Sequence, residues 1–478
     1  MVTKATEAVS FGKAIQSSSS TSLAISRLAP PRADRAFRGV GEAPLGPRAR
    51  VYEHGWQSWS PTGVYPATGT SPRPTSARSQ TVNYRPGAAM PERGFQAAGL
   101  LAFDPGDGGP VRLWSARHPD REIPSIRAVA RDGRLLISAD GEVEEASHEG
   151  GLWPALEVWA DDLARRARLG SFPSQPPGWC TWYQYFTDVR EEDVLENLAA
   201  IARLKLPVSI VQIDDGYQAE IGDWLDRSVR FPRPLKELTS RIQSDGRRAG
   251  IWTAPLLVGA RSKLAADHPD WLVGEADAGH NWNQSLAALD VTHPDAANHL
   301  LHVFGTLADW GFDYFKVDFM YAGALSGRRH SEATGVDAYR RAVHLIRDAI
   351  GPRATLLGCG APILPSVGLY DAMRVSPDVG PLYEPREGDL GMPSQRSAVH
   401  TGRARAFQHA RFWVNDPDCL IVRPGVERRE EWAGHVERFG GLRASSDRLE
   451  SLDEWGLETT RRLLCASPTE PFDLSSLA

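Results

Sequence analysis

The sequence lacks any stretch of about 18 apolar residues, the length that a membrane-spanning helix needs. Its first twenty residues, MVTKATEAVSFGKAIQSSSS, also lack the apolar core of a secretion signal. Only four cysteines occur, and no two of them form a CxxC pair. Scattered cysteines of this kind indicate reduced thiols rather than disulfides. We therefore expect a cytoplasmic protein without a signal peptide or a membrane partner.

The chain also lacks a strong excess of charge and the usual histidine motifs of metal sites. With 54 basic and 60 acidic side chains, the formal net charge of -6 argues against a nucleic-acid binder. Its 13 histidines form no HxH or HExxH motif, so a metal-dependent hydrolase is not favoured. An Asp214-Asp215 pair could hold a divalent cation, but no other hard ligands accompany it. We predict no metal and no other cofactor.

The chain does contain a change from strand-like to alternating strand and helix patterns, about a third of the way along. Residues 1–150 begin with a segment rich in Ser, Ala, Pro and Arg, and from about residue 50 they show short strand-like runs broken by turn residues. Among the turns, Asp132-Gly133 between two apolar runs predicts a hairpin. This part is predicted to be an N-terminal β-sandwich with a poorly ordered start. Residues 151–177 read as a linker helix and a proline-rich joint, residues 178–465 as a catalytic barrel, and residues 466–478 as a C-terminal tail.

In the second part, short apolar runs alternate with amphipathic helical patterns about eight times over roughly 290 residues. This alternation favours a (β/α)8 barrel over a doubly wound sheet, and no GxGxxG motif follows an early strand. The expected strands are residues 179–183, 208–214, 250–255, 314–319, 355–360, 372–377, 412–414 with 420–422, and 442–445.

Polar and aromatic residues stand at the ends of these expected strands, where barrels of this kind place their function. They are Trp182, Tyr183, Asp214, Asp215, Trp252, Lys316, Asp318, Cys359, Arg374 and Asp378. Acidic groups recur from strand to strand, whereas GxSxG elbows and phosphate loops are absent. Paired carboxylates without metal or nucleophile motifs point to glycoside hydrolysis.

Two of these groups fit the roles of such a carboxylate pair. Lys316 and Asp318 share one face of a strand, so that the cation would keep the carboxylate ionised. Only six of the basic residues are lysines, which makes a lysine at this place notable. A buried structural ion pair is the equally acceptable alternative. Asp378, at a strand tip after Pro377, could keep a proton as a general acid, although an Asx turn explains the same pattern.

Seven motifs occur in order between residues 178 and 422, more than half of the chain. They are GWCTWY (178–183), QIDDGY (212–217), GIWTAP (250–255), FKVDF (315–319), GCGAP (358–362), RVSPD (374–378) and WVNDPDCL (413–420). Together they resemble glycoside hydrolase family 36, the microbial α-galactosidase type.

The resemblance implies a retaining exo-α-galactosidase that releases terminal α-linked galactose from small oligosaccharides through a glycosyl-enzyme. Asp318 would be the nucleophile and Asp378 the acid/base. Substrate-binding roles are implied for Asp214 and Asp215 at the O4/O6 edge, Lys316 and Arg374 at ring hydroxyls, Trp252 in the pocket wall, Cys359 near O2, and the strand-end pair Trp182 and Tyr183. Asn415, Asp416 and Asp418 are expected to hold the fold rather than to act in catalysis.

The segment HGWQSWS (54–60) resembles the family's segment that lends an aromatic side chain to the sugar site. Trp59 is the first choice for that side chain and Trp56 the second, with plain domain packing as the alternative. Few residues follow the last motif, so the family's C-terminal β module is expected to be missing or vestigial, which leaves the oligomeric state open.

Alternative readings of the function remain. An α-N-acetylgalactosaminidase, or a relative that transfers galactose to another sugar, would use the same fold and mechanism on a different substrate or acceptor. A barrel that binds sugars without hydrolysing them is a third reading, although both expected catalytic carboxylates are present.

Overall fold

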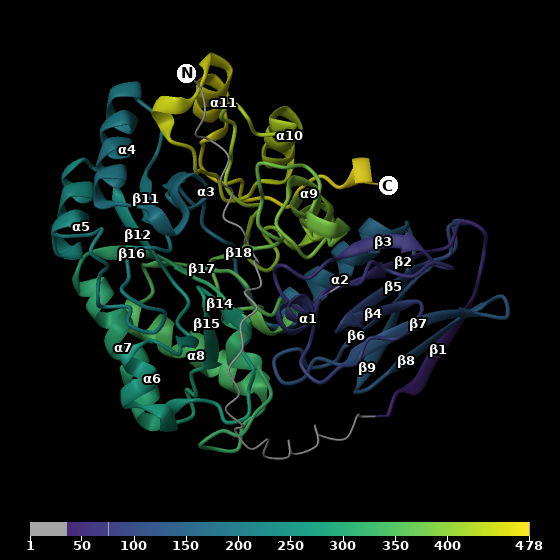
Figure 1. Ribbon diagram of the computed structural model, residues 1–478. Coiled ribbons are helices and arrows are strands. Elements are labelled where there is room, and N and C mark those ends of the chain that lie inside the picture. Colours follow the sequence, from purple (N-terminus) through teal and green to yellow (C-terminus); the bar gives the residue numbers. More distant parts are fainter. Residues whose placement is uncertain (1–35, 75, 478) are drawn as a thin grey trace, which may run out of the picture. The chain divides into compact units, whose positions relative to one another are not determined.

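The computed structural model describes residues 36–74 and 76–477, so the expected poorly ordered start falls on residues outside the described part of the chain. The first nine strands form two antiparallel sheets (Figure 1), with the orders β1-β8-β7-β4 and β3-β2-β5-β6-β9. Their bounds are β1 (Arg38–Pro44), β2 (Arg50–Glu53), β3 (Gly63–Pro66), β4 (Phe95–Ala98), β5 (Leu100–Asp104), β6 (Val111–Ala116), β7 (Ser125–Arg131), β8 (Arg134–Ala139) and β9 (Val143–His148), and α1 (Ala77–Asn83) lies between β3 and β4.

The turn between β7 and β8 shows why this part of the chain folds into hairpins. Asp132 and Gly133 both have positive φ angles, 49° and 74°, as a two-residue turn between twisted antiparallel strands requires. The strands then pair from Arg131 with Arg134 back to Ile126 with Ala139, which confirms the predicted hairpin. Both sheets contribute to one buried cluster, which includes Val51, Leu101, Phe103, Phe95, Ile126 and Ile137.

The second part contains eight parallel strands in the order β19-β18-β17-β16-β12-β11-β10-β20. Their bounds are β10 (Gly178–Cys180), β11 (Ile210–Ile213), β12 (Arg248–Thr253), β16 (Phe312–Val317), β17 (Thr355–Gly358), β18 (Ala372–Arg374), β19 (Val414–Asp416) and β20 (Ala444–Ser445). The outermost strands meet, because Leu442 N–H donates to Asn415 O (2.8 Å) and Leu420 N–H donates to Ala444 O (2.6 Å). The predicted eight-stranded barrel is thus confirmed.

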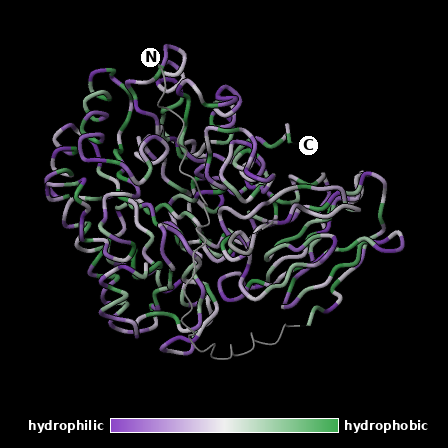
Figure 2. Tube along the Cα trace, viewed as in Figure 1, coloured by the Kyte–Doolittle hydropathy of each residue, from purple (hydrophilic) through white to green (hydrophobic). Residues whose placement is uncertain are grey.

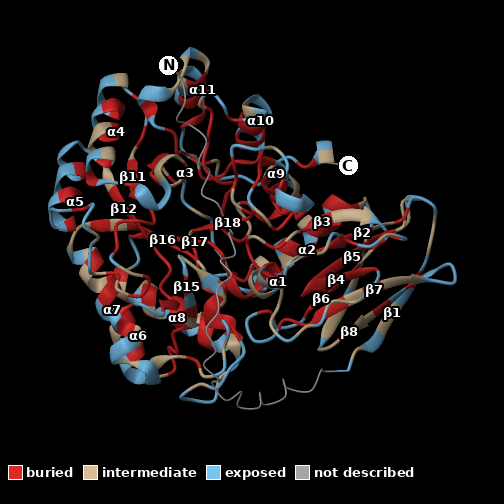
Figure 3. Ribbon diagram, in the orientation of Figure 1, coloured by how far each residue is buried: buried red, intermediate tan, exposed pale blue. Residues whose placement is uncertain are grey.

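Helices surround the barrel, and their buried sides face the strands (Figure 3). In α4, for example, Val194, Leu198 and Ile201 are buried at the spacing of one helical face. Hydrophilic and hydrophobic residues alternate along these helices (Figure 2). No helix within the described residues combines the length and the apolar character needed to cross a membrane. The bounds are α2 (Leu152–Arg166), α3 (Trp182–Tyr185), α4 (Glu191–Leu204), α5 (Leu235–Ser244), α6 (Lys263–Asp267), α7 (Pro294–Asp309), α8 (Gly335–Ile350), α9 (Gln395–Ala404), α10 (Arg429–Phe439) and α11 (Glu454–Leu463).

The alternation of strand and helix is less regular than the sequence predicts. Between β17 and β18 the chain makes only a short 3-10 helix, Leu364–Ser366, in place of an α-helix. Here the barrel contacts the N-terminal part instead. Ser58 N–H donates to Ala361 O (3.0 Å) and Ile363 N–H donates to Trp56 O (2.9 Å). The loop of residues 54–60 therefore lies against this connection.

A small antiparallel sheet lies in the long connection between β12 and β16. It consists of β13 (Leu257–Gly259), β14 (His280–Asn281) and β15 (Gln284–Ala288). The turn between β14 and β15 holds Trp282 and Asn283, both with positive φ angles of 49° and 54°. This excursion brings Trp282 back to the carboxyl ends of the barrel strands.

A buried arginine ties the loop of residues 54–60 to the barrel. Arg405, directly after α9, donates through Nη1 to Ser58 O (2.5 Å) and Val375 O (3.1 Å) and through Nη2 to Gln57 O (2.9 Å) and Ser60 O (3.1 Å). It is fully buried, and no carboxylate of the described residues pairs with it. Burial lowers the pKa of Arg405 to about 9.

We expect Arg405→Met to lower the free energy of unfolding by about 3 kcal/mol or more, because each buried carbonyl left without a donor costs about 1–3 kcal/mol. Urea unfolding measures the change. Arg403→Met, on the exposed side of α9, is the control and should stay within about 0.5 kcal/mol of the wild type. Equal unfolding midpoints for the two variants would contradict this role of Arg405.

Candidate active site

Asp318 lies at the carboxyl end of β16 in a nearly buried position, with 6% of its surface exposed. Its carboxylate accepts hydrogen bonds from Trp252 Nε1 (3.0 Å) and from Phe319 N (2.8 Å). Its own N–H donates to Thr253 O (2.8 Å), which fixes the strand end against β12. Phe319 has a φ of 52°, a strained conformation of the kind that collects at functional sites. The donors hold the Asp318 carboxylate in one orientation.

Lys316 contacts a different carboxylate from the one that the sequence suggested. Its Nζ lies 2.9 Å from Oδ2 of Asp214, and both side chains are almost completely buried. The same Oδ2 accepts from Gln212 Nε2 (2.6 Å), and Oδ1 accepts from Asp215 N (3.0 Å). Burial works against the charge of Lys316, but Asp214 and then Asp318 raise its pKa well above the ordinary value. Lys316 is therefore a buried cation that faces two carboxylates and bonds one.

Asp215 follows Asp214 at the end of β11 and is bound by two side-chain donors. Trp282 Nε1 donates to its Oδ2 (2.7 Å), and Gln218 Nε2 donates to its Oδ1 (2.6 Å). Burial raises the pKa of Asp215 to about 6, although these hydrogen bonds act in the opposite direction. Sequence reasoning missed Trp282, because it lies 67 residues from its partner in a connection without a motif.

Asp378 lies beyond the end of β18, and 28% of its side chain is exposed. Arg374 Nη1 lies 2.9 Å from its Oδ1. Burial raises the pKa of Asp378 above its ordinary value, opposed by Arg374 and Lys316 and reinforced by the charge of Asp318. The charge of Asp318 is therefore one of the causes that favour the protonated form of Asp378.

Arg374 is a buried cation that meets three carboxylates. Besides Asp378, its Nε lies 3.1 Å from Asp416 and its Nη2 lies 2.7 Å from Asp418. The role at ring hydroxyls that the resemblance implies for Arg374 stays a prediction, and its protein partners are these three groups. Asp416 and Asp418, expected to hold the fold, in fact hold this arginine. Tyr183 donates its hydroxyl proton to Asp418.

Trp182 and Tyr183 were expected at the end of a strand, but that strand is short and ends at Cys180. Both residues lie on α3, where Trp182 packs edge-to-face against Phe186 with ring centroids 5.2 Å apart. Tyr183 is buried, and its hydroxyl bonds Asp418. The helix begins early because Thr181 O accepts from Tyr185 N (3.2 Å).

Aromatic side chains surround Phe319, next to Asp318. The Trp59 ring meets the Phe319 ring edge-on with centroids 4.9 Å apart, and the Trp282 ring lies 5.2 Å away. Trp59 comes from the N-terminal part and is half-buried, whereas Trp56 is buried in the hydrophobic core. Of the two tryptophans considered, Trp59 is the one that reaches the neighbourhood of Asp318.

Cys359 and Gly360 close the site beyond β17. Cys359 is completely buried, and burial together with the charge of Asp318 raises the pKa of its thiol well above the ordinary value. Gly360 has a φ of 52°, and a Cβ there would lie 2.9 Å from both the Trp59 ring and Phe319 N. Only glycine fits between these two groups without displacement.

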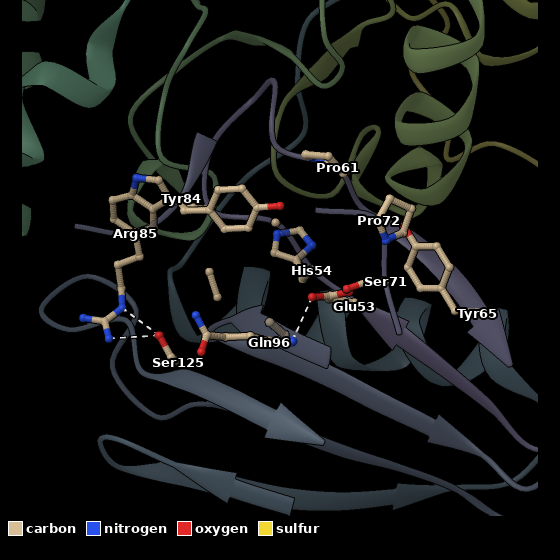
Figure 4. Close-up of a pocket in the computed structure, with 14 residues that line it drawn as sticks. Glu53, His54, Pro61, Tyr65, Ser71, Pro72, Tyr84, Arg85, Gln96 and Ser125 are labelled. Carbon is tan, nitrogen blue, oxygen red and sulfur yellow. Dashed lines mark hydrogen bonds between the residues drawn. The ribbon is translucent and has the colours of Figure 1, made fainter. Parts of the chain in front are cut away.

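No group of three His, Cys, Asp or Glu side chains between residues 36 and 477, residue 75 aside, is arranged to hold a metal ion. A cavity of about 20 Å³ lies in the N-terminal part, lined among others by Glu53, Tyr84 and Ser125 (Figure 4). Its size suits about one water molecule. A larger cavity of about 290 Å³ is lined by Tyr84, Arg85 and Asp277 among others, and Asp277 is the single carboxylate of its lining. The strand-end carboxylates are therefore the stronger candidate for paired-carboxylate chemistry.

Comparison with known proteins agrees with this choice. A family model described as Melibiase matches residues 177–346, which contain Asp214 and Asp318. An α-galactosidase from Escherichia coli is 24% identical over 199 residues, 39% of this chain. The α-galactosidase of Thermus thermophilus, solved in complex with stachyose, has a TM-score of 0.74 and 29% identity, covering 90% of this chain and 96% of that chain. The resemblance to glycoside hydrolase family 36 is confirmed.

Two further relatives define the range of this likeness. A family 36 α-galactosidase from Geobacillus stearothermophilus has the same fold, with a TM-score of 0.58 at 14% identity, and this chain covers 61% of it. A protein from Flavonifractor plautii named A type blood α-D-galactosamine galactosaminidase is 30% identical over 128 residues, 24% of this chain. The matched segments span 28% of the Escherichia coli protein and 12% of the Flavonifractor protein.

Proposed function

We propose that the protein is a retaining exo-α-galactosidase that hydrolyses terminal α-linked galactose from small oligosaccharides. The observation that carries the proposal is the unequal pair of carboxyls at the ends of β16 and β18. Asp318 is held by two donors, whereas Asp378 has a raised pKa and is partly exposed. Two carboxyls with different surroundings are what an acid and a nucleophile require. The named activities of the relatives support the same reaction.

In the first step, the Asp318 carboxylate attacks C1 of the galactosyl unit and forms a glycosyl-enzyme. Trp252 Nε1 and Phe319 N aim the carboxylate through their hydrogen bonds. Asp378, still protonated, gives its proton to the leaving oxygen as the glycosidic bond breaks. In the second step, the Asp378 carboxylate takes a proton from water, the water attacks C1, and Asp318 is released.

The remaining groups of the site recognise the sugar. We assign Asp214 and Asp215 to the hydroxyls that distinguish galactose, with Lys316 and Arg374 as donors beside them. Trp252 and Cys359 line the pocket, and Trp59 closes it from the N-terminal part. Trp182 and Tyr183, placed on α3, are assigned to substrate binding as well.

A hydrolysis panel of aryl α-glycosides tests the proposal directly. The galacto substrate should be cleaved at least tenfold faster than the gluco, xylo and N-acetylgalactosamino substrates. Proton NMR during hydrolysis should show the α-anomer of galactose as the first product. Initial release of the β-anomer would contradict the retaining mechanism, and no cleavage of any galactoside would contradict the activity.

The alternative with support of its own is an α-N-acetylgalactosaminidase, because the Flavonifractor relative carries that kind of name. Room for an acetamido group would have to come from elsewhere than Gly360, which is packed against Trp59 and Phe319. The same panel separates the two donors. Product analysis at high acceptor concentration tests galactosyl transfer, and binding without release of galactose would favour a sugar-binding barrel.

The contact between Gly360 and Trp59 yields a prediction about activity. Gly360→Ala should lower kcat/KM on an aryl α-galactoside by about tenfold or more, because misplacement by about 1 Å is costly at a reacting centre. Gly351→Ala is a matched control, since Gly351 also has a positive φ (75°) but nothing within 4 Å of the added Cβ. It should lose stability without loss of kcat/KM. Equal kcat/KM values for both variants would contradict the proposed role of Trp59.

A further inference from the structure

The three carboxylates around Arg374 differ in what else they hold. Asp418 has a completely buried side chain and accepts from Val379 N (2.7 Å) and Cys419 N (2.6 Å), besides Tyr183 and Arg374. Val379 directly follows Asp378. The Asp418 carboxylate therefore holds the chain at Asp378 from two sides, through the next peptide N–H and through the guanidinium that bonds Asp378.

The backbone at Asp418 is strained in a way that this arrangement explains. Its φ is 97°, outside the ordinary regions for a residue with a side chain. Such conformations are costly and persist where the surroundings impose them. Asp418 N also donates to Asp416 Oδ1 (2.9 Å), so that the strained turn points two carboxylates at one arginine.

We propose that Asp418 is a positioning residue for the acid/base Asp378, a role that rests on the proposed function. By sharing Arg374, Asp418 limits how strongly the guanidinium stabilises the Asp378 carboxylate, so that Asp378 stays protonated at the start of the reaction. By accepting the Val379 N–H hydrogen bond, Asp418 fixes the backbone position from which the Asp378 side chain extends. Asp416 shares Arg374 but has no contact to Val379, so Asp418 alone combines both effects among the three.

The charged and titratable groups that face Asp378 come from several strands. They are Arg374 on its own strand, Lys316 and Asp318 from β16, and Asp214 from β11. The charge of Asp378 also acts on three further groups, Tyr183 from α3, Cys359 beyond β17 and Asp418 beyond β19. Removal of the Asp418 charge leaves Lys316 and Arg374 to act on Asp378 with less competition, which favours its ionised form.

The test is the pH dependence of kcat/KM for Asp418→Asn. The amide keeps an oxygen for Val379 N–H but has no charge. The limb that falls at high pH reports loss of the Asp378 proton and should move to lower pH by about one unit, the size of effect that a neighbouring charge has. The loss of kcat should be larger for melibiose than for a nitrophenyl galactoside, because only the poor leaving group needs full protonation.

Two further variants keep the test decisive. Asp447→Asn is a matched control, since Asp447 is also a fully buried carboxylate that binds an arginine, Arg423 (2.6 Å), and a peptide N–H, that of Val422 (2.6 Å). It should lose stability while keeping the pH profile. Tyr183→Phe removes one donor from Asp418 without removing its charge, so that Asp418 binds Arg374 more strongly. The limb should then move to higher pH and by less, and this variant serves if Asp418→Asn does not fold.

The outcomes separate this inference from the proposed function. A wild type without activity on any galactoside contradicts the proposed function, and the inference with it. An active wild type with unchanged pH limbs in Asp418→Asn and Tyr183→Phe overturns the inference alone. The inference is also overturned if Asp447→Asn shifts the limb as far as Asp418→Asn does, because the shift would then reflect a general loss of rigidity in the fold.

Discussion

Asp318→Ala should lower kcat on an aryl α-galactoside by about 10⁴-fold or more, the effect of removing an essential nucleophile. The loss follows because no other carboxylate is aimed by Trp252 Nε1 and Phe319 N. Added azide should enter the vacated space and attack the substrate from the opposite face. The product should be the β-galactosyl azide, which NMR of the reaction mixture identifies.

The control for this variant lies on the same strand. Asp313→Ala changes a carboxylate at the other end of β16, where it pairs with Arg248 at 2.9 Å. It should keep kcat within about twofold of the wild type, as expected for a partly exposed ion pair away from the chemistry. Near-full activity of Asp318→Ala would show that the nucleophile is elsewhere.

Asp378→Ala should lower kcat by about 10²- to 10⁴-fold, the contribution of a positioned general acid and base. The variant should retain more activity on nitrophenyl galactoside than on melibiose, because the nitrophenolate leaves without a proton. Azide should restore turnover by attacking the glycosyl-enzyme, and the product should be the α-galactosyl azide. The two azide products, β for Asp318→Ala and α for Asp378→Ala, distinguish the two roles.

The raised pKa of Asp378 also fixes the direction of the pH dependence. A carboxyl must be protonated to act first as an acid, so activity is present below its pKa and is lost as the pH rises through it. The high-pH limb of the wild type should therefore be absent in Asp378→Ala with nitrophenyl galactoside. Asp371→Ala, whose carboxylate pairs with Arg347 before β18, is the control and should keep that limb. Persistence of the limb in Asp378→Ala would assign it to another group.

Most of the barrel follows from sequence pattern alone. The expected strands at 208–214, 314–319 and 372–377 overlap β11, β16 and β18, because buried parallel strands need short apolar runs between helical patterns. The site carboxylates follow from the same pattern, since the carboxyl ends of parallel strands lie on one rim of the barrel. Asp214, Asp318 and Asp378 are placed on this rim by the strands that precede them.

The features that could not be foreseen depend on contacts between distant segments. Strand alternation puts Lys316 and Asp318 on one face, but only packing decides that Lys316 bonds Asp214, 102 residues away. The hydrogen bond from Trp282 to Asp215 depends on a small sheet whose strands have as few as two residues. The missing helix between β17 and β18 reflects contact with the loop of residues 54–60, which a local pattern does not contain.

The position of Trp59 has a consequence for how this molecule can be divided. The ring that touches Phe319 belongs to the loop of residues 54–60, and Arg405 binds three peptide oxygens of that loop and one of the barrel. A shortened gene that starts at residue 178 would encode every strand of the barrel and every carboxylate of the site. Its product would nevertheless lack the Trp59 ring beside Phe319 and would leave Arg405 without its partners in the loop. We therefore expect the smallest active unit to include both parts of the chain.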